Sequence, residues 1–449
     1  MENKLLRKPK SIDEVENKYQ YLGFTRNPFP NEPAVKPYSA DSRVNGSIFL
    51  EKIRAEEIKE FNDHIVNAPN KIGLLMDYAA YKGRGIGKTA FLNHMKNSIN
   101  SDLGDNVSEG NSVLYAVYVS PSADKSYRTL NDVAHSIFTS MHKEGLFLTV
   151  FCRLRALSGL LDGVIDDTID ESNYESTIAN DDWLVKHEID VPGVNKFVLG
   201  ELAKAGLTDD TSNLFGANYQ SFCKLLDENR NDFFWKKEGL SFLFDKVEKL
   251  LKAAMFTNCI ILLDEAEKMI QYQNSNERRA LCDNLRYYFI DGACSNAIDG
   301  FFKIVMTIHP NSQELLMPHW AAAGLDRICS LGGDTSSENT IFFKPMSNDE
   351  IMISEFAEIY LHESRIDKNI NTIAPFNQEA INYAMEKTDR IPGKFLKLLY
   401  LMIEKAVQHK WETIDREKVD MAWKESNKNY SSQNITPDET PLPKTKVEL

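Results

Sequence analysis

The sequence lacks long hydrophobic runs. No stretch of it approaches the roughly 18 consecutive apolar residues that a membrane-spanning helix needs. The start of the chain is rich in charged residues and has no apolar segment of the kind found in secretory signals. We therefore expect no membrane partner and a cytoplasmic location.

Paired cysteines and a surplus of positive charge are also missing. The six cysteines show no CxxC spacing, which predicts buried, reduced thiols and excludes a disulfide framework. The net charge of -14 argues against a protein that coats nucleic acid without sequence preference. A local basic patch that binds DNA is still compatible with this charge. With 42% hydrophobic residues, the chain has apolar material for a large core and more than one domain.

Strand and helix patterns alternate in the first part of the chain. The apolar run Lys71 to Tyr78 predicts a strand, Ala79 to Gly87 a glycine-rich loop, and Thr89 to Ile99 a helix. A second strand at Ser112 to Val119 precedes a helix at Thr129 to Met141. This βαβ alternation predicts an α/β fold in which helices cover both faces of a parallel sheet, as three layers.

The core pattern is interrupted and then resumes. Residues 146–235 are predicted to be a mostly helical, acidic insertion. After it come a helix at Leu240 to Met255 and a wholly apolar strand at Cys259 to Leu263. The later core elements are predicted at Glu277 to Phe289 (helix), Phe301 to Ile308 and Thr340 to Phe343 (strands).

Four regions follow from these patterns. Residues 1–44 form an N-terminal arm with an apolar anchor at Tyr21 to Phe29, and residues 45–345 form the core, which opens with an amphipathic helix at Asn45 to Asn67. Residues 346–426 contain four helical patterns and are predicted to form a C-terminal helical lid, the last helix at Asp415 to Trp423. Residues 427–449 have three prolines and no core residues, which predicts a disordered tail.

The glycine-rich loop is typical of phosphate binding. It lies between a strand and a helix, so its backbone N–H groups and the helix amino end converge on phosphate oxygens. Lys88 is expected to reach the β and γ phosphates, and Thr89 to hold magnesium. Lys82 stands where the usual pattern has its first glycine. The residues expected to bind the nucleotide are Gly83, Arg84, Gly85, Ile86, Gly87, Lys88, Thr89 and Ala90.

Two acids follow the apolar strand that ends at Leu263. Asp264 is expected to hold Mg²⁺ through water, and Glu265 to orient and deprotonate the attacking water. Together with the phosphate loop they predict an ATP hydrolase of the P-loop NTPase class with ATP and Mg²⁺ as cofactors.

Further residues are candidates for contacts to the nucleotide, and each of them has an alternative interpretation. Thr307 or His309 follows the next strand and is expected to contact the γ phosphate or the water, although His309 also suits a helix or loop cap. Arg327 is a candidate arginine finger for a neighbouring subunit, with a surface ion pair as the alternative. Arg390 or Lys394 opens a lid helix from which one of them is expected to reach the nucleotide.

Taken together, the motifs resemble the AAA+ superfamily in order and spacing. The resemblance implies that Thr307 is sensor 1, Arg327 the finger and Arg390 sensor 2, although Gly393 stands where the family's lid arginine is usual. Asn27-Pro28-Phe29 and the run Leu262 to Glu267 are most similar to initiator and transposon target-selection ATPases and to ATPases of phage-defence operons.

Three functions compete at this point. The first is an ATPase that drives or regulates assembly of a homo-oligomer with ATP at subunit interfaces, in DNA transactions or anti-phage defence. The second is a nucleotide-gated scaffold that recruits an effector nuclease or protease with little turnover. Nucleic-acid translocation, with Arg153-Leu154-Arg155 and Lys236-Lys237 as basic loops, ranks third. The acidic insertion is read as a solvated face or as a dock for a basic partner.

Overall fold

The computed structural model describes residues 17–77, 85–101, 113–121, 127–165, 169, 171–209, 218–331 and 339–432. Within them the chain divides into two compact units. The larger unit contains residues 54–77 and the described residues from 88 to 344. The smaller unit contains residues 17–53, 85–87 and 345–432.

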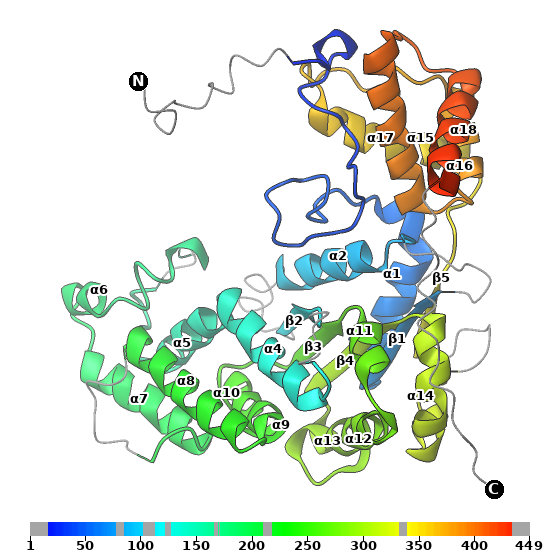
Figure 1. The fold of residues 1–449 in the computed structure, drawn as a ribbon. Coiled ribbons are helices and arrows are strands. Elements are labelled where there is room, and N and C mark those ends of the chain that lie inside the picture. Colours follow the sequence, from blue (N-terminus) through cyan, green and yellow to red (C-terminus); the bar gives the residue numbers. More distant parts are fainter. Residues whose placement is uncertain are drawn as a thin grey trace, which may run out of the picture. The chain divides into compact units, whose positions relative to one another are not determined.

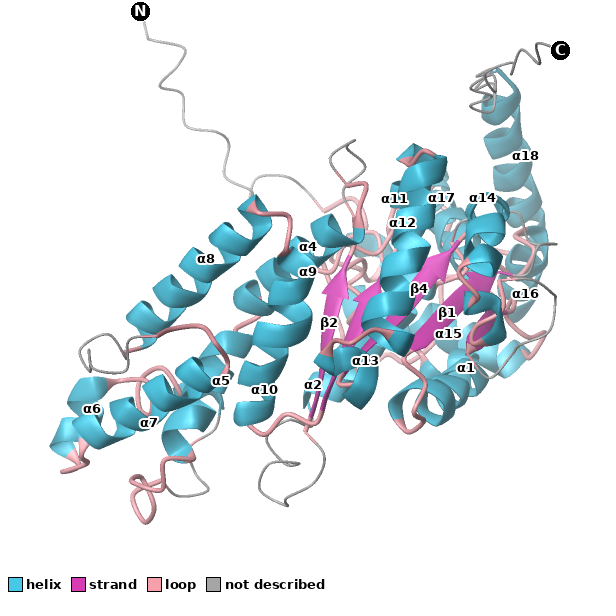
Figure 2. Ribbon diagram, turned by 90° about the horizontal axis from the view of Figure 1, so that it is seen from below, coloured by secondary structure: helices cyan, strands magenta, loops and turns pink. Residues whose placement is uncertain are grey.

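A five-stranded parallel sheet lies at the centre of the larger unit (Figure 2). The strands are ordered β2-β3-β4-β1-β5, so β1 and β3 are separated by one strand. The strands are β1 (Ile72–Asp77), β2 (Leu114–Val119), β3 (Asn258–Leu263), β4 (Phe302–Ile308) and β5 (Thr340–Phe343). They lie where the sequence predicts them, within a residue or two, and the predicted α/β fold with a parallel sheet is confirmed.

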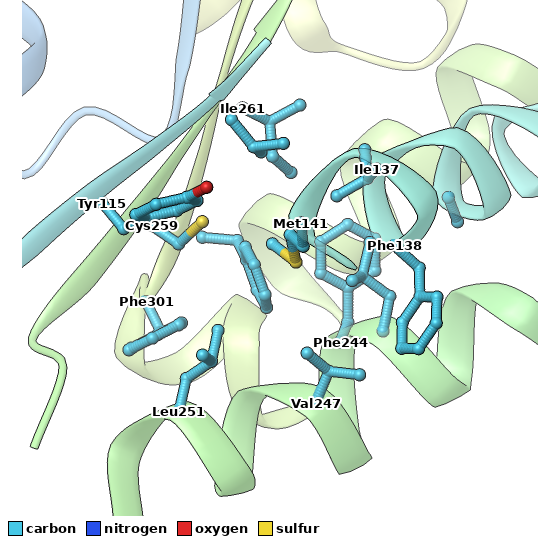
Figure 3. Close-up of a cluster of buried hydrophobic side chains, with 14 of the residues drawn as sticks. Tyr115, Ile137, Phe138, Met141, Phe244, Val247, Leu251, Cys259, Ile261 and Phe301 are labelled. Atoms are coloured by element: carbon cyan, nitrogen blue, oxygen red, sulfur yellow. The ribbon is translucent and has the colours of Figure 1, made fainter. Parts of the chain in front are cut away.

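Each face of the sheet has its own helical layer. Helices α1 (Ala55–Phe61) and α2 (Lys88–Ser101) contact β5 and β2 and meet through Phe61 and Phe91, whose ring centroids are 5.7 Å apart. On the opposite face, alternate strand residues such as Tyr115, Cys259 and Ile261 join a large buried cluster with α4 (Leu130–Lys143) and α10 (Glu248–Ala253), as Figure 3 shows. The alternation is the two-residue period of a β-strand.

The segment predicted as an insertion is mostly helical and shares this buried cluster. Its helices pack their apolar side chains against the same core as α4 and the sheet. These side chains are therefore apolar because they are buried. They are α5 (Leu146–Ala156), α6 (Asp181–Lys186), α7 (Val191–Lys204) and α8 (Tyr219–Trp235).

The arginines of α5 are structural, contrary to their interpretation as a basic loop. Arg155 is fully buried, donates to the Ile178 carbonyl at 3.0 Å and pairs with Asp181 at 2.6 Å. Arg153 donates to the Ala254 carbonyl at 2.6 Å, and burial lowers its pKa. Side chains that hold helices together in this way are not available to line a pore.

The remaining elements of the larger unit connect these layers. Helix α14 follows β4 directly, and a short turn of helix, η10, then carries Arg327. These elements are α9 (Gly239–Ser241), η8 (Phe242–Val247), α11 (Ala266–Tyr272), α12 (Ser275–Arg286), η9 (Tyr287–Asp291), α13 (Ser295–Asp299), α14 (Pro310–Ala322) and η10 (Leu325–Arg327).

The helix predicted at Asn45 to Asn67 begins later than expected. The structure has η4 (Glu51–Arg54), α1 and the π-helical η5 (Asn62–Val66), whereas residues 45–50 are not helical. Gly46 has a φ of 86°, a left-handed conformation that interrupts a right-handed helix. The apolar side chains before residue 54 pack in the smaller unit and not on the sheet.

The smaller unit is a helical domain with its own core. Its helices, coloured from yellow to red in Figure 1, are α15 (Glu350–Ser364), α16 (Gln378–Lys387), α17 (Pro392–His409) and α18 (Arg416–Ser432). The predicted anchor joins this core through Phe24 and Phe29, both fully buried. Glu404 on α17 accepts hydrogen bonds from Tyr19 at 2.5 Å and Asn27 at 2.9 Å, which ties the anchor to the helix.

One boundary of the smaller unit differs from its prediction. Helix α18 continues to Ser432, so the start of the tail predicted from Asn427 is helical and not disordered. The physical reason is that no proline or glycine interrupts the sequence between Trp423 and Ser432. No helix of the described residues is both long and apolar enough to cross a membrane.

Candidate functional site

The glycine-rich loop leads directly into α2. Gly85 and Gly87 have φ values of 103° and 105°, which side-chain-bearing residues rarely adopt, so glycine is required at both turns. Lys88 and Thr89 are the first residues of α2, where the helix amino end favours anions. Ile86 is buried, and Ala90 follows in the same turn of helix. Gly83 and Arg84, also expected to bind the nucleotide, lie outside the described residues.

The phosphate-loop lysine has an intramolecular partner. The Lys88 ammonium lies 2.6 Å from Oδ2 of Asp77, the last residue of β1. The Asp77 side chain is 1% exposed and that of Lys88 is 15% exposed. The pair therefore joins the strand before the loop to the helix after it.

Asp264 is held by several donors at the carboxyl end of β3. Its Oδ1 accepts the Thr307 hydroxyl at 2.8 Å and the backbone N–H of Glu265 at 2.9 Å. Its Oδ2 accepts the Tyr118 hydroxyl at 2.8 Å. The residue is 1% exposed. These bonds fix the carboxylate in one orientation, as expected for a group that positions a metal-bound water.

The register of β4 places Thr307 beside Asp264. Leu262 of β3 pairs with Val305 of β4, and Thr307 lies two residues further along on the same face. The Thr307 hydroxyl also accepts the Glu265 N–H at 2.6 Å, so one side chain contacts both acidic residues. His309 lies beyond the strand, where it caps α14 through its ring nitrogen and the Asn311 N–H. Of the two alternatives, the structure brings Thr307 to the acids.

Glu265 occupies a strained position between two partners. Its φ of 51° is left-handed, a conformation that is costly for a residue with a side chain and is typical of functional sites. Its Oε2 accepts the Ser120 hydroxyl at 3.2 Å and forms an ion pair with Lys268. Both carboxylates of the predicted catalytic pair therefore have defined hydrogen-bond partners.

A further acid lies at the same edge of the sheet. Burial raises the pKa of Glu267, as do the neighbouring carboxylates of Asp264 and Glu265, whereas the Lys88 ammonium opposes the rise. Its Oε2 is buried without a hydrogen-bond partner among the described residues. These electrostatic couplings place Lys88, Asp264, Glu265 and Glu267 in one neighbourhood.

This arrangement decides the fold class of the core. A parallel strand, a glycine turn and a helix that begins with Lys88-Thr89 share the sheet with β3, which lies two positions away and is followed by Asp264. The larger unit has the fold of a P-loop NTPase. The donor set suits Mg-ATP, because magnesium takes one or two protein oxygens plus phosphate oxygens and does not need a protein cage.

Comparisons with known proteins give distant likenesses. No family model and no curated protein matches the chain. Among solved structures, the Aeropyrum pernix ORC2 protein in its ADPNP-ADP complexes is 11% identical, covering 89% of this chain and 71% of that one, with a TM-score of 0.39. The A. pernix ORC1 protein in complex with DNA is 12% identical, covering 88% and 69%, with a TM-score of 0.38. The P-loop NTPase assignment rests on the geometry of the chain itself.

Arg327 lies on a surface cavity of the larger unit. The cavity has a volume of about 320 Å³ and is lined by residues of α12, η9, α14 and η10, including Arg286 and Ile290. Arg286 pairs with Asp291 at 2.6 Å and donates to the Ala323 carbonyl at 2.7 Å, which supports the turn that carries Arg327. Arg327 is exposed and forms no ion pair with the described residues, so the alternative of a salt-bridged surface arginine does not apply within them.

The lid candidates lie at the start of α17 in the smaller unit. Arg390 has a φ of 60°, and its guanidinium lies 3.5 Å from the Asn348 side-chain oxygen. Lys394 pairs with Asp389 at 3.3 Å. Gly393 donates its N–H to the Gly85 carbonyl at 2.8 Å, and a Cβ on Gly393 would lie 3.0 Å from Gly85 backbone atoms. This close approach explains why position 393 is a glycine.

Several site residues are missed by reading the sequence. Asp77, Tyr118 and Ser120 lie at the ends of β1 and β2, where a polar side chain after an apolar strand was the available signal. Glu267 and Lys268 follow the acidic pair within one helical turn. Asp77, Tyr118 and Ser120 belong to no motif of their own, and tertiary packing brings them to the site.

Proposed function

We propose that this chain is an AAA+-type ATPase that binds and hydrolyses Mg-ATP to drive or regulate assembly of an oligomeric complex. The observation that carries the proposal is the network in which the Thr307 hydroxyl joins the Asp264 carboxylate to the Glu265 backbone. The phosphate-loop lysine acts electrostatically on Glu267, as Asp264 and Glu265 do, which supports a single site.

The proposed roles follow from the chemistry of each group. Lys88 binds the β and γ phosphates, and the Thr89 hydroxyl and Asp264 hold magnesium, which neutralises phosphate charge when bound. Glu265 orients the attacking water and accepts its proton. Thr307 orients the Asp264 carboxylate and the Glu265 backbone, and holds the water or the γ phosphate. Arg390 stays the candidate for a lid contact to the nucleotide.

The oligomer is supported by the surface around Arg327. An exposed guanidinium without an ion pair among the described residues, beside a cavity of about 320 Å³, suits insertion into the nucleotide site of a second copy. Chemical complementarity between this cation and a bound γ phosphate gives a reason for ATP-dependent assembly. DNA transactions or anti-phage defence, with DNA or an effector protein as partner, are the settings that we propose for such an assembly.

A nucleotide-gated scaffold with little turnover is the second candidate. The observation that favours it is the ion pair between Glu265 and Lys268. A carboxylate oxygen that binds an ammonium is not free to accept a hydrogen bond from the attacking water, so this contact opposes proton abstraction for as long as it persists. Under this alternative, ATP binding alone recruits an effector nuclease or protease.

The deciding experiment compares wild type with Glu265→Gln. Steady-state phosphate release is measured with and without double-stranded DNA, fluorescent-nucleotide binding is measured in parallel, and the oligomer mass is followed with and without ATP. The glutamine keeps the shape and the hydrogen bonds of the side chain but cannot accept the proton. We expect turnover to fall at least about 100-fold while the nucleotide Kd changes little.

Each outcome separates the candidates. Turnover in wild type that is lost in Glu265→Gln, together with ATP-dependent assembly, supports the oligomeric ATPase. Nucleotide binding and assembly without turnover in wild type support the gated scaffold. Absence of nucleotide binding in a folded wild type contradicts both.

A further inference from the structure

The lysine of the phosphate loop forms an ion pair with a buried carboxylate. Asp77 ends β1, and its Oδ2 lies 2.6 Å from the Lys88 ammonium. Its second oxygen, Oδ1, is buried and has no hydrogen-bond partner among the described residues. The Lys88 ammonium therefore pairs with this buried negative charge. The same ammonium is the group that is expected to bind the nucleotide phosphates.

The position of Asp77 follows from the sheet. It pairs with Phe343 of the edge strand β5, on the face covered by α1 and α2. The Phe343 ring packs against Phe91 of α2, with ring centroids 5.1 Å apart, and the guanidinium of Arg54 lies 5.0 Å from the Phe343 centroid. Because the Asp77 side chain is only 1% exposed, water does not readily replace the lysine.

Arg54, a nearby cation, binds other groups. Arg54 pairs with Glu57 at 2.9 Å and donates to the Lys344 carbonyl at 2.7 Å. Burial lowers the pKa of Arg54, whereas the charges of Glu57 and Asp77 oppose this. The direct partner of Asp77 among the described residues is Lys88.

We propose that Asp77 is an intramolecular competitor for Lys88, which holds the phosphate-loop lysine when no nucleotide is bound and so weakens nucleotide affinity. The proposal rests on the proposed function and names a regulation of the same site. Asp77 is a positioning residue, because it acts through Lys88 and has no contact of its own with the reacting atoms.

Nucleotide binding has to disrupt the pair of Asp77 and Lys88. Binding of β and γ phosphates requires the Lys88 ammonium to leave Asp77 or to be shared with it, and an unshared buried carboxylate is costly. The same carboxylate repels the incoming phosphates at short range. Nucleotide therefore binds a state that is only partly populated, and the apparent Kd is raised by the inverse of that population.

The first test measures nucleotide affinity. Wild type, Asp77→Asn and the matched control Asp299→Asn are titrated with fluorescent ADP and with fluorescent ATP in the presence of Mg²⁺. Asp299 also pairs with a lysine, Lys252, at 2.8 Å, but on the surface of the larger unit. We expect Asp77→Asn to bind both nucleotides roughly tenfold more tightly, and Asp299→Asn to bind as wild type does.

The second test does not depend on nucleotide. Lys88→Met removes the partner of a buried carboxylate and should lower Tm without nucleotide by about 4 °C or more, and adding Asp77→Asn should restore most of that loss. Unchanged stability in Lys88→Met, or no rescue by the double variant, overturns the proposal even if Asp77→Asn alone does not fold.

The outcomes for the proposal and for the proposed function are distinct. If wild type binds nucleotide and a folded Asp77→Asn binds it equally or more weakly, the competition is wrong and the ATPase assignment stands. If no variant binds nucleotide but the stability cycle behaves as expected, the proposed function fails while the buried pair is established.

Discussion

Thr307 is the residue whose chemistry is most sharply defined by its contacts. Its hydroxyl donates to the Asp264 carboxylate and accepts from the Glu265 backbone, so it links the proposed metal-holding group to the backbone of the proposed base. A hydroxyl that bridges two reacting groups controls their relative position more than their individual affinity for nucleotide. Its removal is therefore expected to affect turnover rather than binding.

We predict that Thr307→Val lowers kcat by roughly 10- to 100-fold while the Kd for ATP stays within about threefold of wild type. Valine keeps the volume and the β-branched shape of the side chain and removes only the hydroxyl. Single-turnover phosphate release and fluorescent-nucleotide binding measure the two quantities.

Thr307→Ser is the matched control, since it keeps the hydroxyl and loses only a methyl group. We expect it to retain most of the activity. Equal loss of kcat in the valine and serine variants would show that packing at this position matters and the hydroxyl does not.

At the scale of elements, one lysine of the sheet, Lys303, binds the end of the helical segment formed by α1 and η5. Lys303 of β4 is 5% exposed, and its ammonium donates to the carbonyls of Ile65 at 2.7 Å, Val66 at 3.0 Å and Ala68 at 2.7 Å. Burial lowers the pKa of Lys303. The last carbonyls of a helix have no intrahelical partner, so this side chain caps the end of α1 and η5.

We predict that Lys303→Met destabilises this end of the helix by about 3 kcal/mol, because it leaves buried carbonyls without a donor. Hydrogen exchange at residues 62–70 of the full chain measures the local stability directly, which avoids a two-state assumption for a chain of two units.

Lys59→Met is the control on the same helix, where the lysine is exposed, and it should change stability by no more than about 0.5 kcal/mol. A Lys303→Met variant whose exchange matches that of Lys59→Met would refute the capping role.

At the scale of the whole molecule, the question is whether one nucleotide site draws residues from two chains. Arg327 lies beside a surface cavity and makes no ion pair with the described residues, while Lys88, Asp264 and Glu265 are in the larger unit of the same chain. If the arginine completes a neighbour's site, two chains that are defective in different parts can complement each other.

We predict that Arg327→Ala and Glu265→Gln each hydrolyse ATP at least about tenfold more slowly than wild type, and that mixing them restores activity above their sum. In mixed assemblies an intact Glu265 of one chain meets an intact Arg327 of the other. Steady-state phosphate release over a range of mixing ratios measures the effect.

Arg279→Ala serves as the control, because Arg279 is an exposed arginine of α12 that pairs with Asp283. It should leave activity unchanged in isolation and in mixtures. Mixed Arg327→Ala and Glu265→Gln chains that show only the sum of their activities would place Arg327 outside a shared site.

The sequence by itself determined the local features of this protein. The apolar strands, the glycine turn before Lys88-Thr89 and the acidic pair after β3 were readable because strand and helix periods and turn residues act over a few neighbouring positions. The order of these elements also determined a parallel α/β sheet, since each strand is followed by a helix that must cross over it.

Only the tertiary structure decided which side chains meet. The pairing of β3 with β4 brought Thr307 rather than His309 to the acids, and the packing of α2 on the sheet brought Lys88 to Asp77 at the end of β1. The non-helical residues 45–50 likewise joined the smaller unit, although their apolar spacing predicted a helix on the sheet. Register and burial depend on contacts between residues far apart in the chain, and no local pattern encodes those contacts.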